Sequence, residues 1–335
     1  MKHRAASRYL VLSIAVTLAS VVATAQTRGT AAGTPPALTP DGHPDLQGIW
    51  LSNAATPLER PKQLEGRAFL TDEEVAVLKQ RYDKLFADGS SDFAGGDSAF
   101  LAALGNLDRY KNPGTTENSI GMKERVFDNR TSLVVDPPDG RIPAPTPEGR
   151  ERQTATGRIR GGANAAGPDN LTSDVRCITF GTPRVGGNYG SGHFGYYQIV
   201  QTPSYLVLVT EAIHEARVVP LDGGAHLPSS IKLWNGDSRG RWEGNSLVVD
   251  TTNFSSKSFF MGATENLHLV ERFTRVAPDR IDYQVTFDDP TTWSKPWTVV
   301  IRLRHTDEQM YEFACHQGNH DIMRGILVGA RTQEK

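Results

Sequence analysis

The sequence predicts a mainly β protein in which an antiparallel meander forms a barrel or a strongly curved sheet, preceded by an N-terminal extended and helical segment. From about residue 195 onward, apolar and polar residues alternate in short runs that are joined by turn-rich links, with no helix pattern between them. The 32 Gly and 20 Pro residues also favour a chain rich in turns. Barrel closure would remove the open edges that so many strands leave, and a two-sheet sandwich is the alternative.

The chain begins with a pattern typical of a secretory signal peptide. Lys2, Arg4 and Arg8 precede the uncharged run Leu10–Val22, and a small-x-small cleavage site ends at Ala25. A membrane anchor is the alternative, but the run is too short to span a bilayer comfortably. We therefore predict that residues 1–25 are removed, that no stable membrane anchor is left after cleavage, and that the mature chain is periplasmic or extracellular.

Residues 26–130 are predicted to form a Pro-rich tether followed by an N-terminal helical segment. The stretch 26–42 is rich in small residues, Pro and Thr, and the first bulky apolar residues follow at 43–50 as a candidate docking strand. A helix begins where Thr71 and Glu74 form a capping box. It continues with apolar residues at helical spacing and ends at Gly89.

Residues 131–335 are predicted to form the antiparallel β domain. The strand Ser132–Asp136 opens it, and 142–172 is expected to be a long loop because it has few large apolar residues. The candidate strands beyond the loop are Tyr196–Gln201, Tyr205–Ala212, Glu215–Val219, Ile231–Trp234, Ser246–Asn253, Asn266–Val276, Arg280–Asp288, Trp297–Arg304 and Gln309–Cys315.

The two cysteines, Cys177 and Cys315, are expected to form a disulfide because the chain is predicted to be exported. Free buried thiols and a nucleophilic cysteine are the alternatives. The sequence contains no C-x-x-C-H, which excludes covalently attached c-type haem, and no C-x-x-C pair, which argues against a Cys-based zinc site.

The charge balance argues against a nucleic-acid partner, since the formal net charge is -2 and no block of Lys or Arg is present. A multi-span membrane protein is excluded because no second long apolar run follows the first. A small-molecule ligand is the expected partner, and the sequence predicts no oligomeric state.

Strand alternation places Glu271 among large apolar side chains. In its predicted strand, Glu271 shares a face with Leu269 and Phe273, whereas His268 and Arg272 share the opposite face. One interpretation is a carboxylate that pairs with an arginine and holds the sheet together. The other is an acid or base with a raised pKa that faces a cavity.

Two further polar groups are candidate acids and bases. Glu312 and His316 share a face of the last predicted strand, close enough for the carboxylate to orient the imidazole, and a surface pair is equally open. His214 and Arg217 belong to the crowded turn 211–217, for which a solvated hairpin tip with salt bridges is the alternative.

Aromatic residues near the predicted strand ends are candidate ligand-binding groups, because aromatic and charged side chains at one barrel mouth would suit a ring-containing ligand. The candidate ligand-binding residues are Arg217, Trp242, Trp293, Trp297 and Tyr283.

No metal and no cofactor are predicted. The glycine-rich segment 186–192 lacks the Lys of a phosphate loop, and neither G-x-S-x-G nor H-E-x-x-H occurs. His214, His226, His268 and His316 could converge on a metal, but their spacing follows no familiar ligand template.

Several longer phrases resemble those of a group of exported bacterial proteins. The phrases are Pro44–Trp50, Arg130–Pro143, Arg239–Gly244, Leu247–Phe254 and Leu267–Phe273. The resemblance implies export and assigns no catalytic residue. The β-rich half is also similar in pattern to lipocalin-like barrels, which is a likeness of architecture alone.

The function predicted from these residues is a cofactor-independent acid/base enzyme of the lyase, isomerase or hydrolase type, acting on a small apolar or aromatic molecule in a barrel cavity. The candidate bases are Glu271 and Glu312, the candidate acids are His214, His268 and His316, and Arg217 or Arg272 would stabilise an oxyanion. One alternative is a non-catalytic carrier that uses the same cavity. The other is a carbohydrate-binding or carbohydrate-cleaving protein, suggested by the tryptophans.

Overall fold

The computed structural model describes residues 37–87, 96–109, 125–160, 167–183, 195–258 and 260–333, all of which belong to one unit over residues 34–335. The predicted signal peptide, most of the predicted tether, Gly89 and the segment 186–192 lie outside the described residues. Within the described part of the chain, no helix is both long and apolar enough to cross a membrane.

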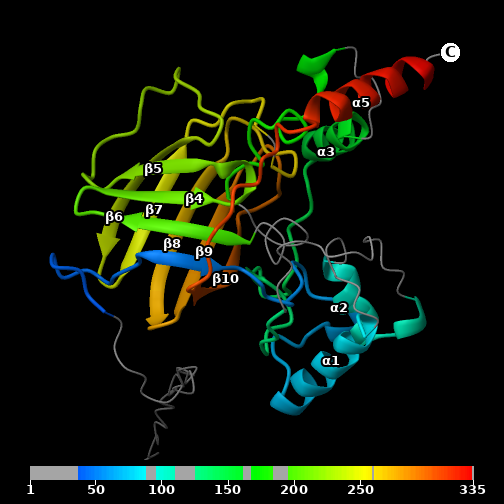
Figure 1. The fold of residues 1–335 in the computed structure, drawn as a ribbon, viewed down its shortest axis with the longest axis vertical. Helices are drawn as coiled ribbons and strands as arrows, with labels where there is room; N and C mark the ends of the chain where they lie inside the picture. The colour runs from blue at the N-terminus through cyan, green and yellow to red at the C-terminus, as the bar shows by residue number, and fades with distance from the viewer. Residues whose placement is uncertain are drawn as a thin grey trace, which may run out of the picture. The chain divides into compact units, whose positions relative to one another are not determined.

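An antiparallel sheet of 10 strands forms the centre of the fold, which confirms the prediction of a mainly β, antiparallel protein (Figure 1). The strands follow the order β5-β4-β3-β1-β10-β9-β8-β7-β6, and β2 pairs with β10. Their bounds are Gly48–Leu51 (β1), Val134–Asp136 (β2), Tyr196–Gln201 (β3), Tyr205–Thr210 (β4), Ala216–Pro220 (β5), Asp237–Glu243 (β6), Ser246–Thr252 (β7), His268–Ala277 (β8), Arg280–Asp288 (β9) and Trp297–Thr306 (β10).

The sheet is curled but is not closed into a barrel, so of the two predicted forms, a barrel or a strongly curved sheet, the barrel is wrong. The path of paired strands ends at β5 on one side and at β6 on the other. The two edges nevertheless approach each other, and Gly240 in β6 lies against Val219 and Leu221. In Figure 1 the green strands β3–β5 cross in front of the yellow and orange strands β7–β9, as expected for a sheet that curls back over itself.

The core lies on the inner face of the curl. Ile281, Tyr283, Val285 and Phe287 alternate with more exposed residues along β9, as the period-two pattern predicts. Phe287 stacks on Trp297 in the neighbouring strand at 4.1 Å between ring centroids. Full burial of each such side chain stabilises the fold by about 1.5–3 kcal/mol, so this face supplies much of the driving force for folding.

The segment before residue 130 contributes a central strand. β1 lies between β3 and β10, and the fully buried Trp50 donates from Nε1 to the Leu46 carbonyl at 2.9 Å. Gly48 has a positive φ of 128°, and a Cβ there would meet the His305 ring at 3.0 Å, so glycine alone suits this position. The predicted domain boundary at residue 130 stays a prediction.

Four α-helices are described: Asp72–Leu85 (α1), Gly96–Leu104 (α2), Pro147–Arg160 (α3) and Asn319–Gln333 (α5). The predicted capping box begins α1, since Thr71 Oγ1 accepts from the Glu74 amide and Glu74 Oε2 accepts from the Thr71 amide. Leu78 and Tyr82 of α1 pack with Phe100 of α2 in a second small core.

Two parts of the expected architecture are wrong. Helix α3 lies inside the stretch predicted to be a long loop, and it is held by polar contacts, such as Arg152 Nε to the Gly262 carbonyl at 3.0 Å. The stretches Ile231–Trp234 and Gln309–Cys315, predicted as strands, are irregular. The polar edge strand β6 was not predicted, because the alternation of Asp237–Glu243 is polar on both faces.

Cys177 and Cys315 form the predicted disulfide, with a Cα–Cα distance of 5.7 Å. It joins the turns after residue 170 to the segment that leads into α5. A disulfide is consistent with an oxidising compartment such as the periplasm or the extracellular space.

Candidate functional site

A buried ion pair spans the inside of the curled sheet. Arg217 extends from the inner face of β5, and its Nη1 and Nη2 donate to Glu271 Oε2 and Oε1 in β8 at 2.5 and 2.7 Å. Tyr283 of β9 also donates to Glu271 Oε1, at 2.5 Å. Glu271 is fully buried, so three donors replace the water that its carboxylate would otherwise bind.

The electrostatics of this cluster keep Arg217 charged and Tyr283 protonated. Burial lowers the pKa of Arg217, but the charge of Glu271 and its hydrogen bonds outweigh burial and raise that pKa above its usual value. Burial and then the charge of Glu271 raise the pKa of Tyr283 well above its usual value, so the phenol stays protonated and donates. Both oxygens of Glu271 are occupied by groups of the protein itself.

The cavity beside this cluster is small. Tyr197, Arg217, Phe273 and Tyr283 are among its lining residues, and its volume is about 30 Å³. That volume has room for about two water molecules. This cavity therefore offers no space for the ring-containing ligand that the sequence suggested.

His268 lies on the opposite face of the sheet from Glu271, as strand alternation predicts. Its Nε2 is 2.9 Å from Asp250 Oδ2, and the other oxygen of Asp250 is 2.9 Å from His226 Nε2. His226 Nδ1 is in turn 2.9 Å from Asp237 Oδ2. The result is a linear chain of two imidazoles and two carboxylates on the outer face of β6–β8, in which the two ring nitrogens of His226 contact one carboxylate each.

The pKa of Asp237 reflects this chain. Burial raises the pKa, but the hydrogen bonds from the Leu227 amide and from His226 outweigh burial, so the pKa lies below its ordinary value. These contacts hold the loop between β5 and β6 against the sheet. Among the described residues, no cluster of three or more His, Cys, Asp or Glu side chains has a geometry that could hold a metal ion.

The remaining predicted acids and bases lie elsewhere. His214 Nδ1 is 3.6 Å from Glu312 Oε1, and both side chains are more than half exposed. Because Gln309–Cys315 forms no strand, Glu312 and His316 do not share a strand face, and His316 is exposed. Arg272 contacts Glu243 Oε2 at 2.8 Å on the outer face and does not reach Glu271.

The predicted ligand-binding tryptophans are distributed between the core and the surface. Trp293 and Trp297 are buried and pack edge to face at 5.5 Å between ring centroids. Trp242 is partly exposed and stacks on His43 at 4.5 Å. The structure therefore brings together Arg217, Glu271 and Tyr283, and it separates the other predicted residues from them.

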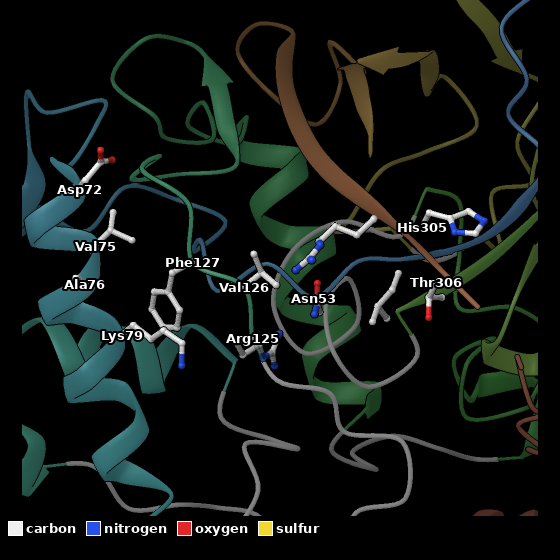
Figure 2. A pocket seen from close by; sticks show the side chains of 12 residues that line it. Asn53, Asp72, Val75, Ala76, Lys79, Arg125, Val126, Phe127, His305 and Thr306 are labelled. Atoms are coloured by element: carbon white, nitrogen blue, oxygen red, sulfur yellow. The ribbon is translucent and has the colours of Figure 1, made fainter. Parts of the chain in front are cut away.

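A larger cavity, not predicted from the sequence, lies between α1 and the outer face of β1 and β10. We call it the α1 groove, and its volume is about 680 Å³. Figure 2 shows the α1 side chains on one side and those of β10 on the other. The lining residues are Leu51, Asn53, Asp72, Val75, Ala76, Lys79, Arg125, Val126, Phe127, Arg304, His305 and Thr306.

Backbone pairing fixes the walls of the α1 groove. Leu51 of β1 and Arg304 of β10 are register partners, so they share the outer face of the sheet. The Val126 amide donates to the Asn53 carbonyl at 2.9 Å, which holds residues 125–127 beside the end of β1. Phe127 anchors the helical side through an edge-to-face contact with Tyr82.

The α1 groove combines apolar walls with positive charge. Leu51, Val75, Val126 and Phe127 supply apolar surface. The charged lining residues are Lys79, Arg125 and Arg304, which are positive, and Asp72, which is negative. No sequence signal marks this site, because its residues come from four parts of the chain that only the tertiary fold brings together.

Comparisons with models of known protein families, with curated proteins and with solved structures each found no match to this chain.

Proposed function

We propose that the chain is an exported carrier of a small amphipathic molecule, which it binds in the α1 groove. The observation that supports this proposal is the groove itself, whose volume of about 680 Å³ falls in the range of small-molecule sites. Its apolar walls suit an aliphatic or aromatic body, and its polar groups suit a single polar end.

The positions of the candidate acids and bases favour a carrier over the acid/base enzyme predicted from the sequence. A general base needs an oxygen or nitrogen within hydrogen-bond reach of the substrate. Both oxygens of Glu271 already accept from Arg217 and Tyr283, and the adjoining cavity of about 30 Å³ is too small for an aromatic ring. His268 is on the other face of the sheet, so it cannot act on the same molecule as Glu271.

Export is part of the proposal and rests on the sequence of residues 1–25 together with the disulfide. Expression in a Gram-negative host followed by mass spectrometry of the periplasmic fraction tests it. The expected mature chain begins at Gln26. A full-length chain in the cytoplasm would contradict export.

The α1 groove is tested with the fluorescent probe 1-anilinonaphthalene-8-sulfonate, which has an aromatic body and one anionic group. Wild-type protein should bind the probe with a saturable rise in fluorescence, and Ala76→Trp should abolish that rise because the indole fills the groove. Gln80→Trp adds the same bulk to an exposed position of α1 outside the lining and should bind as wild type does. Equal binding by wild type and Ala76→Trp would contradict the proposal.

A further inference from the structure

The outer face of the sheet differs in character between its two halves. On β6–β8 it carries charged side chains such as Arg241, Asp250 and Arg272, as expected for a face in contact with water. On β3–β5, all of which the structure describes, no outer-face residue is charged. An apolar face that stays exposed on a sheet whose other half is charged indicates an interaction site.

Cross-strand pairing places the exposed apolar side chains of β3–β5 side by side. Val200 of β3 pairs with Val207 of β4, which pairs with Val218 of β5, so the three valines form one continuous row. In the next row Tyr205 pairs with Pro220. Val200, Tyr205 and Val218 are 38%, 49% and 56% exposed. We call these five residues the valine face.

Two properties of the valine face favour a second copy of this chain as its partner. A flat sheet face packs well on another flat sheet face, about 10 Å away. The valine face also has no charge for a charged partner to neutralise, and two copies face to face would bury no unpaired charge. In a two-fold dimer centred on the valine row, Val207 lies opposite the same residue of the other copy.

The size of the face fits the apolar core of such an interface. Three strands about 4.8 Å apart, with about six residues of about 3.4 Å each, cover roughly 300 Å². A specific interface buries about 800 Å² per partner, which includes a polar rim around the apolar core. Gln198 and Thr202 lie at the margins of the face and are suited to such a rim. The area therefore fits a weak, reversible dimer.

We infer that the valine face is the contact surface of a reversible homodimer, in which β3–β5 of two copies pack face to face. The inference goes beyond the proposed function and is independent of it, because the lining of the α1 groove shares no residue with the valine face. It also names an oligomeric state, which the sequence does not predict.

Sedimentation equilibrium of the whole disulfide-bonded protein measures the dimer directly. Between about 5 µM and about 1 mM, the apparent mass should rise from that of one chain toward that of two. Val218→Lys places a charge in the interface and should weaken dimerisation at least about tenfold. Val276→Lys changes a valine that is 41% exposed on the outer face of β8, and it should dimerise as wild type does. Thermal unfolding checks that both variants are folded.

A cysteine in the valine row tests the geometry without adding a charge. Both native cysteines are joined in the disulfide, so an introduced thiol is the sole free one. Oxidation with copper phenanthroline should convert Val207→Cys to a covalent dimer, because the two thiols face each other across the interface. Val276→Cys is equally accessible but lies outside the face, so it should stay monomeric under the same oxidation.

Three results would each overturn the inference: a wild type that stays monomeric over the whole concentration range, a folded Val218→Lys that dimerises as wild type does, or equal cross-linking of Val207→Cys and Val276→Cys. A monomer in which the introduced thiol of Val207→Cys also resists alkylation would show instead that another part of the same chain covers the face. Loss of 1-anilinonaphthalene-8-sulfonate binding would contradict the proposed function and leave the dimer unaffected.

Discussion

A carboxylate without access to water, such as Glu271, is stable only when its partners replace the water. Moving an ion into the protein interior costs several kcal/mol, and the attraction between the ions offsets this cost only when their geometry is good. The bidentate contact from Arg217 and the hydrogen bond from Tyr283 supply that geometry. The cluster therefore joins β5 to β8 and β9 across the inside of the sheet. We expect its loss to lower the free energy of unfolding.

Glu271→Gln should lower the free energy of unfolding by about 3–5 kcal/mol, because Arg217 is left buried without a counter-ion. Urea denaturation at neutral pH measures this loss. Tyr283→Phe removes one hydrogen bond and should cost only about 1–2 kcal/mol. The double variant Glu271→Leu with Arg217→Met should be more stable than Glu271→Gln. A Glu271→Gln variant as stable as wild type would show that the pair does not hold the sheet.

The lowered pKa of Asp289 predicts how the stability of the fold changes with pH. Its carboxylate accepts from the Thr264 amide at 2.7 Å and from the Thr291 and Thr292 hydroxyls at 2.7 and 2.9 Å. Burial raises the pKa of Asp289, but these hydrogen bonds outweigh burial and hold it below the ordinary value of 3.8. A pKa lowered by folding adds stability above the unfolded pKa, and this stability is lost as the pH falls through the folded pKa.

Wild type should therefore lose stability as the pH falls below about 4, and Asp289→Asn should show a shallower decline over the same range. At neutral pH the variant should be less stable by about 1–3 kcal/mol, because its amide cannot accept all of these hydrogen bonds. Urea midpoints measured from about pH 5 to about pH 2.5 test both effects. Parallel curves for the two proteins would mean that Asp289 does not titrate differently in the folded state.

Helix α5 depends on contacts distant in sequence. Met323, Ile326 and Leu327 pack on the buried Leu171, and this is a small core separate from that of the sheet. Asn319 Nδ2 also donates to the Val175 carbonyl at 2.8 Å. The disulfide Cys177–Cys315 fixes the chain immediately before the helix to the turn that carries these partners.

Replacing both cysteines by serine should lower the stability of α5 more than that of the sheet. The disulfide closes a loop of 138 residues, for which the chain-entropy model gives about 4–5 kcal/mol. Hydrogen exchange followed by mass spectrometry should show a larger increase in exchange rate in α5 than in β8 and β9. Wild type treated with a reductant should reproduce the pattern. Unchanged exchange in α5 would contradict this role for the disulfide.

The elements that the sequence predicts correctly are those with local causes. The capping box of α1 needs only Thr71 and Glu74, and the alternation of β9 needs only its own residues. Helix α3 has no apolar periodicity, and it is held by long-range hydrogen bonds from Arg152 and Gln153 to backbone carbonyls. The segment Gln309–Cys315 does alternate, but none of the strands that the structure describes pairs with it, so alternation alone was an insufficient basis for that prediction.

At the scale of the whole molecule, segments distant in the sequence decide whether the sheet closes into a barrel. They also decide whether the α1 groove forms. The sequence correctly placed Glu271 on the buried face and His268 on the other face, because alternation is a property of one strand. It could not identify Arg217 as the partner of Glu271, since that contact exists only because the sheet curls. The α1 groove likewise requires α1, the segment at Arg125 and the end of β10 to meet.

The contact between the two sheet edges should be sensitive to the size of residue 240. A Cβ at Gly240 would lie 2.4 Å from Leu221 Cδ2 and 3.1 Å from Val219 Cγ1. Gly240→Val should therefore separate β5 from β6, lower the free energy of unfolding by about 1–3 kcal/mol through overpacking, and speed hydrogen exchange in β5. Gly157→Ala is the matched control, since a Cβ in α3 meets nothing within 4 Å and should stabilise the helix by about 0.5–1 kcal/mol. If Gly240→Val is as stable as wild type and exchanges at the same rate in β5, the edges are not held against each other by this contact.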